Sequence, residues 1–174
     1  MDPISVHTTT FEKYGSPLES AVDAKSLAET IIEHAEQMLL DHGEVQPAVV
    51  FLHEDQVTLA PLSFESEEQK DLVSEFITTL GGKLGAHAIG FVSESWMAQA
   101  ETDDKEEVAK IVPSKHPNRK EILMATTTWR DVFGKERAAR VTYIKRDDEG
   151  KITDLFRDDN DLEDLSKCSG RFVF

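Results

Sequence analysis

Three residues of this sequence could together carry out acid–base chemistry: Glu94, His116 and Arg119. A carboxylate can act as a general base, a histidine as the matching acid, and an arginine can bind an anionic substrate group. Glu94 falls near the end of an expected strand, and the other two fall in the long connection behind it, where side chains often converge on a cleft. The trio predicts a hydrolase or transferase site. The alternative is that Glu94 forms an ion pair with Arg119 while Trp96 covers the core.

Basic residues are concentrated in one part of a strongly acidic chain. The formal charge is −15, yet residues 110–146 hold ten of the 19 lysines and arginines. With only three acids against those ten bases, the segment carries +7, which leaves −22 for the rest of the chain. Such a surface attracts small anions or acidic protein surfaces, while the surrounding charge repels extended nucleic acid. The side chains expected to bind a partner or an anion are Arg119, Lys120, Arg137, Arg140 and Arg146.

A second explanation of the charge pattern is internal. Residues 158–164 form an acidic run that could fold back over the basic strands and neutralise them. The basic strands would then need no external partner.

The sequence predicts neither a cofactor nor a metal ion. The six histidines are scattered, and Cys168 is the single cysteine, so no zinc-ligand spacing occurs. The glycine-rich residues 81–85 follow an expected helix and lead into a strand, which is the reverse of a phosphate-binding loop.

Two amphipathic helices and a set of strands must position these residues. Apolar residues recur at helical spacing over residues 23–42, and Ser66 opens a capping box before a second helix that should stop at Gly81 and Gly82. Strands are expected at residues 48–52, 57–61, 86–97, 121–129, 138–146 and 152–156. The order is α-β-β-α-β, a long loop over residues 99–118, and then β-β-β. It predicts an α+β fold with a mainly antiparallel sheet of five to six strands and two main helices.

The chain divides into three expected parts. Residues 1–20 form a polar N-terminal arm, residues 21–157 a single α+β domain, and residues 158–174 an acidic C-terminal tail that ends in an apolar segment. That apolar segment could add a strand to its own sheet or to the sheet of a neighbouring subunit. We find no run apolar enough for a membrane span and no signal peptide. We therefore expect a cytoplasmic protein without membrane contact.

Two resemblances to known proteins accompany this reading. The order of the expected elements is similar to that of roadblock, longin and profilin-like domains. Residues 92–97, which end in Trp-Met, and the Pro-Ser-x-x-Pro-x-Arg element from Pro113 to Arg119 resemble segments of uncharacterised bacterial proteins. The resemblance implies no activity, but it directs attention to Glu94, Ser114 and His116.

We therefore expect a non-enzymatic protein-interaction or assembly module that associates with itself or with a protein partner. It would use the strands of residues 110–146 and the two termini. The alternatives are an enzyme centred on Glu94 and His116, and a regulatory domain that binds a small anion on its basic strands.

Overall fold

The computed structural model describes residues 9–12, 18, 21–54 and 56–157. They form a seven-stranded antiparallel sheet in the order β1-β3-β2-β4-β5-β6-β7. The strands are β1 (Thr9–Glu12), β2 (Ala48–His53), β3 (Gln56–Pro61), β4 (Ala88–Met97), β5 (Lys120–Asp131), β6 (Gly134–Arg146) and β7 (Ile152–Arg157). The helices are α1 (Ala24–His42), α2 (Glu67–Leu84), the short α3 (Lys105–Ala109) and the 3-10 turn η2 (Pro113–Lys115). The predicted α+β class and the order of its elements are confirmed.

Helix α1 begins and ends where the sequence predicts. The carboxylate of Asp23 accepts a hydrogen bond from the backbone N–H of Ser26, and the Ser26 hydroxyl accepts one from the N–H of Asp23. This reciprocal pair satisfies donors that the first helical turn would otherwise leave free. Gly43 ends the helix with φ +79°, a left-handed conformation that a residue without Cβ adopts at little cost.

Helix α2 begins at its predicted cap, Ser66, but the predicted stop at Gly81 and Gly82 is wrong. Both glycines lie inside the helix, which ends at Gly85. A Cβ on Gly81 would come within 2.7 Å of Cδ1 of Ile89. Gly81 therefore allows α2 to lie close to the sheet. In the sequence alone, this glycine resembles one that ends a helix.

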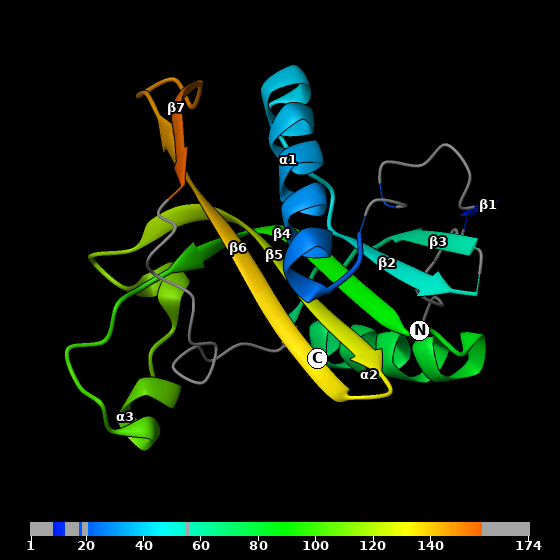
Figure 1. The fold of residues 1–174 in the computed structure, drawn as a ribbon. Coiled ribbons are helices and arrows are strands. Elements are labelled where there is room, and N and C mark those ends of the chain that lie inside the picture. The colour runs from blue at the N-terminus through cyan, green and yellow to red at the C-terminus, as the bar shows by residue number, and fades with distance from the viewer. Residues whose placement is uncertain (1–8, 13–17, 19–20, 55, 158–174) are drawn as a thin grey trace.

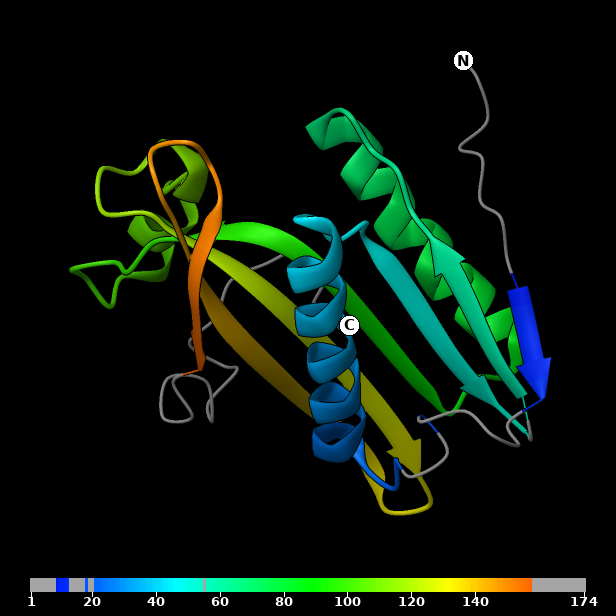
Figure 2. The ribbon, with the colours of Figure 1, turned by 90° about the horizontal axis from the view of Figure 1, so that it is seen from above.

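The two long helices lie on opposite faces of the sheet (Figure 1) and cover different strands. Helix α1 packs on β4, β5 and β6, where Leu27 and Ile32 join Leu123 in the largest apolar cluster. Helix α2 covers β2, β3 and β4 from the other side, where Ile77 and Phe51 belong to a second apolar cluster. Figure 2 shows this offset, with α1 in front of the central strands and α2 behind β2 and β3. Part of the sheet face opposite α1 therefore lies outside the cover of α2.

Strands β5 and β6 form a longer hairpin than the sequence predicts. Their register runs from Ile122 opposite Tyr143 to Asp131 opposite Gly134. The sequence prediction ends β5 at residue 129 and begins β6 at residue 138. Residues 134–137 are exposed and mostly polar, so no apolar alternation marks them, but backbone pairing continues to the turn.

Two further segments add detail that the prediction lacks. Strand β1 lies within the predicted N-terminal arm and pairs with β3, which brings the sheet to seven strands rather than five or six. The predicted loop of residues 99–118 contains α3 and η2, neither of which has a buried residue. The sequence predicts an N-terminal arm that ends at residue 20 and an acidic tail that begins after residue 157. The tail lies outside the described residues, and this division of the chain stays a prediction.

A pair of neighbouring leucines tests the packing of α1. Leu39 is completely buried, whereas Leu40 is 59% exposed. We expect Leu39→Ala to lower the free energy of unfolding by about 2–5 kcal/mol, because it leaves a cavity in the core. Leu40→Ala should change it by less than about 0.5 kcal/mol. Urea unfolding of both variants measures the difference, and equal losses would contradict the described face of the helix.

Candidate functional site

Glu94 is a partly buried carboxylate held from two sides. Its Oε1 accepts a hydrogen bond of 2.5 Å from the backbone N–H of Val45, and its Oε2 lies 3.3 Å from Nη2 of Arg146. Burial raises the pKa of Glu94 above its usual value, against the opposing effects of Val45 and Arg146, and the nearby Glu121 and Glu44 raise it further. The sequence alternative that pairs Glu94 with Arg119 is wrong, because Arg146 on β6 forms that ion pair.

Arg146 is the centre of a polar cluster that we define as Glu94, Glu121 and Arg146. Its Nε lies 2.9 and 3.1 Å from the two carboxylate oxygens of Glu121. Its Nη1 donates to the carbonyls of Gly43, at the end of α1, and Gly150, in the turn before β7. One guanidinium thus joins the end of α1 to strands β4, β5 and β6 and to the last turn. Nε, Nη1 and Nη2 each donate within the fold, so an external anion would compete with the carboxylates and carbonyls that Arg146 already binds.

The structure brings only part of the predicted catalytic trio together. A small cavity of about 140 Å³ is lined by Glu94, Ser95, Trp96 and Glu121. The guanidinium of Arg119 lies 5.0 Å from the centre of the Trp96 ring, in a cation–π contact that places it beside this cavity. His116 is not in the lining, and its Nδ1 accepts a hydrogen bond of 3.1 Å from the backbone N–H of Asn118. His116 therefore does not join Glu94 in this cavity, and the catalytic role of the two residues stays a prediction.

Several of the predicted anion-binding residues contact groups of the same chain. Arg140 donates to Glu29 of α1 at 2.8 Å, and Arg146 belongs to the polar cluster. Nζ of Lys120 lies 5.2 Å from the centre of the Tyr143 ring. The described carboxylates that neutralise the two arginines come from α1, β4 and β5. The acidic run of residues 158–164, which the sequence offered for this role, lies outside the described residues.

A second set of ion pairs fastens the end of β7 to α1. Arg157 donates two hydrogen bonds to Glu36, both at 2.7 Å, and also pairs with Glu29. The hydroxyl of Thr142 donates to Glu36 as well. Burial alone would raise the pKa of Glu36, but the hydrogen bonds from Arg157 and Thr142 outweigh it and hold the pKa below its usual value.

The most exposed apolar residues of the described chain lie at the turn between β5 and β6. Val132 is 94% and Phe133 is 95% exposed. The turn itself is built by other residues: the Asp131 carboxylate accepts from the N–H groups of Phe133 and Gly134, and Gly134 has φ +136°. Sequence reasoning missed this pair. The signal that could have located them is the presence of two bulky apolar residues between Asp131 and Gly134, because a turn does not require apolar side chains at those positions.

Three cations share one face of the same hairpin. Arg130 lies directly opposite Lys135, and Arg137 follows two residues later on β6, so the strand pleat turns all three the same way. Glu136 alternates to the other face. Burial and the charges of Arg137 and Arg130 lower the pKa of Lys135. Within the part of the chain that the structure describes, we observe no ion pair for these three. We call residues 130–137 the hairpin tip.

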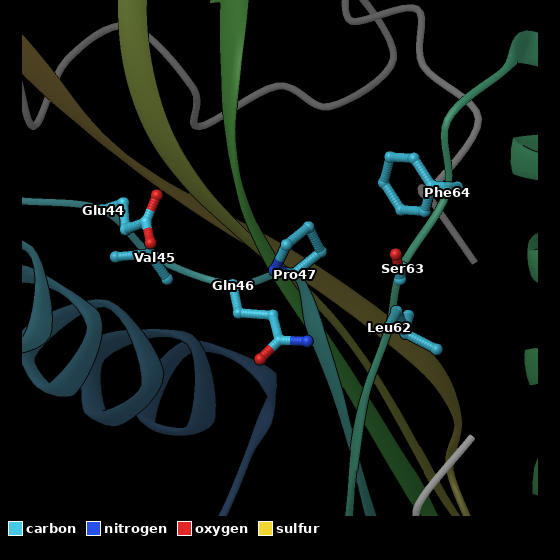
Figure 3. Close-up of a pocket in the computed structure, with 7 residues that line it drawn as sticks. All are labelled: Glu44, Val45, Gln46, Pro47, Leu62, Ser63 and Phe64. Carbon is cyan, nitrogen blue, oxygen red and sulfur yellow. The ribbon is translucent and has the colours of Figure 1, made fainter. Parts of the chain in front are cut away.

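A larger pocket lies far from the hairpin tip, between the loop before β2 and the loop after β3. It has a volume of about 330 Å³ and is lined by Glu44, Val45, Gln46, Pro47, Leu62, Ser63 and Phe64. Figure 3 shows the ring of Phe64 on one loop pointing toward Pro47 on the other. Apolar groups line both sides, and the Glu44 carboxylate and the Gln46 amide add polar groups at one side.

Among residues 9–12, 18, 21–54 and 56–157, we find no group of three metal-binding side chains. None of the described helices has both the length and the apolar character needed to span a membrane.

The fold and these surfaces define an α+β protein whose sheet carries a protruding, partly apolar and partly cationic hairpin. The family model of Bacteriophage lambda protein ea47 matches residues 6–166, so the chain belongs to that family. The sequence predicted a resemblance to uncharacterised bacterial proteins. The family that matches is named after a bacteriophage protein, and that name states no activity. No curated protein and no solved structure matches the chain. The resemblance to roadblock, longin and profilin-like domains stays a prediction.

Removing the Arg157 guanidinium tests the ion pairs between α1 and β7. Because the pKa of Glu36 is lowered in the folded protein, its contribution to stability is present above the unfolded pKa of about 4.3 and is lost as the pH falls through the folded pKa. Arg157→Met should lower the free energy of unfolding at pH 7 by about 1–3 kcal/mol. The difference from wild type should shrink near pH 3.

The control is Lys145→Met, which removes an exposed pair with Asp154 at 4.0 Å. It should cost less than about 1 kcal/mol at either pH. Urea unfolding at both pH values measures the effect, and a loss from Arg157→Met that is the same at pH 3 and pH 7 would contradict the electrostatic origin.

Two substitutions at Glu94 separate its charge from its hydrogen bond. Because the pKa of Glu94 is raised, the stability that it contributes in protonated form is lost as the pH rises through the folded pKa. Glu94→Gln keeps an oxygen for the Val45 N–H without the charge, so it should stay within about 1 kcal/mol of wild type at pH 7. Glu94→Ala leaves that N–H without its acceptor and should cost about 1–3 kcal/mol. Chemical unfolding at pH 7 should rank the variants in this order, and a larger loss for glutamine would be evidence against it.

Proposed function

We propose that the chain is a non-enzymatic protein-interaction module that presents its hairpin tip to a protein partner. The observation that carries the proposal is the near-complete exposure of Val132 and Phe133 at the end of a long, regularly paired hairpin. Large apolar side chains on soluble surfaces gather at contact sites, and an aromatic anchor can supply much of the energy of such a contact.

The chemistry of the turn supports a role outside the fold. Asp131 and Gly134 supply the hydrogen-bond acceptor and the positive φ that the turn requires. Val132 and Phe133 add no packing to the molecule, so their burial must come from another molecule if it is to contribute stability. Polar residues would serve the isolated turn equally well.

The charges around the apolar pair favour an acidic partner surface. Arg130 and Lys135 face each other across the hairpin, an arrangement of like charges that is unfavourable in isolation. Carboxylates on a partner would relieve this repulsion. A long nucleic acid fits less well, because the whole chain carries −15 and would repel the phosphates beyond the tip.

The polar cluster supports the non-enzymatic part of the proposal. Glu94 is held by Arg146 and by the backbone N–H of Val45, and Arg146 also binds Glu121 and the carbonyl of Gly150. These contacts suit a joint between α1 and the sheet. A general base needs an oxygen that is free to take a proton from a substrate.

Site-specific photo-crosslinking tests the proposal. A photoreactive phenylalanine analogue replaces Phe133 in one version of the full chain and Val112 in another. Val112 is 50% exposed and lies outside the hairpin, which makes it the control. On irradiation of cells that produce the chain, we expect a discrete protein adduct from position 133 only. The absence of an adduct at 133, or the same adducts at both positions, would overturn the proposed role of the tip.

A further inference from the structure

We infer that the hairpin tip of one copy inserts into the pocket between Glu44 and Phe64 of a second copy. This inference rests on the proposed function and names the partner. It joins the two surface features that the fold does not itself use, namely the exposed Val132 and Phe133 and the pocket lined by residues 44–47 and 62–64.

The tip cannot reach the pocket of its own chain. The pocket adjoins the start of β2, where Ala48 pairs with Val92, which in turn pairs with Ala125 of β5. The turn begins at Asp131, six residues further along β5, or about 20 Å at the rise of an antiparallel strand. Figure 2 shows the start of β2 and the yellow turn between β5 and β6 toward opposite ends of the sheet. The contact must therefore join two molecules.

The pocket offers both space and apolar groups to the tip. The pocket volume of about 330 Å³ lies at the lower end of the range of pockets that hold compact ligands. Its accessible apolar groups come from the half-buried Pro47 and Phe64, against which the Phe133 ring can pack, while Val45 and Leu62 are buried beneath the surface. The backbone of the turn is already held by the hydrogen bonds to Asp131, so insertion has to order only the side chains of Val132 and Phe133.

The charges match as well. Glu44 contributes a carboxylate to the pocket, and the cationic face of the tip carries Arg130, Lys135 and Arg137 next to the apolar pair. The remainder of a second copy is strongly acidic, since the chain outside residues 110–146 carries the excess of negative charge. A cationic tip on one copy and an acidic body on the next attract each other, whereas two acidic bodies side by side repel.

The geometry fixes the type of assembly. The tip and the pocket are different surfaces, so each copy has one free tip and one free pocket after the first contact. Such head-to-tail contacts build rings or open chains rather than symmetric dimers.

A mixing experiment tests this arrangement with two exposed-surface variants of the full chain. The tip variant is Val132→Ser with Phe133→Ser. The pocket variant is Glu44→Lys with Ser63→Trp, which reverses a charge and fills the pocket from a position that is exposed. The control is Glu33→Lys with Val112→Ser, which reverses one charge, as the pocket variant does, and removes one exposed apolar side chain, as the tip variant does, elsewhere on the surface. Circular dichroism checks that each variant is folded.

Light scattering over a range of protein concentrations gives the solution mass. Wild type and control should grow beyond a dimer as the concentration rises. Each of the two test variants alone should remain monomeric, with an association constant reduced at least tenfold. An equimolar mixture of both should form dimers and nothing larger, because one intact tip meets one intact pocket. Higher salt should weaken every one of these contacts.

The possible failures separate this inference from the proposed function. If the tip variant is monomeric but the pocket variant assembles like wild type, the tip binds elsewhere and only the pocket assignment fails. A wild-type chain that is monomeric throughout overturns the second copy as partner. The adduct at position 133 then decides whether another protein takes its place. Sedimentation of wild type, but not of the tip variant, with phosphatidylserine vesicles would assign the tip to a lipid surface and overturn both.

Discussion

The packing of α1 across β4, β5 and β6 is the constraint on which the rest of this structure depends. Gly90 of β4 leaves room for the side chain of Ile31, because a Cβ at that position would overlap it. The hydroxyl of Thr127 donates to the carbonyl of Ala24 at 2.6 Å and fixes the start of the helix on β5. Arg146 binds the carbonyl of Gly43 at the other end. With both ends fixed, the helix buries the apolar face of the strands and presents carboxylates to their basic side chains.

The charge asymmetry of the sequence takes on a physical meaning through this helix. Residues 110–146 carry an excess of positive charge, and the rest of the chain carries an excess of negative charge. Side chains of opposite charge form ion pairs where α1 crosses β6 and approaches β7. Glu29 and Glu36 neutralise Arg140 and Arg157, and the polar cluster neutralises Arg146. Arg130, Lys135 and Arg137, on the face of the hairpin away from α1, are among the basic residues for which the described part of the chain shows no ion pair. Carboxylates of the same chain thus neutralise part of the basic surface, and partner binding stays a proposal for the rest.

Local signals in the sequence predict the elements well, and contacts between distant residues account for what they miss. Capping residues and helical periodicity located both ends of α1, because those signals act within a few residues. The partner of Glu94 could not be read in this way, since Arg146 lies 52 positions away and meets it only after β4, β5 and β6 align. Gly81 was wrongly predicted to end α2, because in a sequence a glycine that permits close packing cannot be distinguished from one that ends a helix. The tip was missed because strand prediction follows apolar alternation, which stops before the backbone pairing does.

The long hairpin also determines how the molecule would respond to force. A pull on the turn along β5 and β6 acts parallel to the strands, so it loads the ladder from Ala88 opposite Trp129 to Met97 opposite Lys120 all at once. These hydrogen bonds share the load instead of opening one after another. A pull at right angles, on the end of β7 at Arg157, would open its pairs with β6 in sequence. The protein is therefore mechanically anisotropic, with its stiffest direction along the axis of the hairpin.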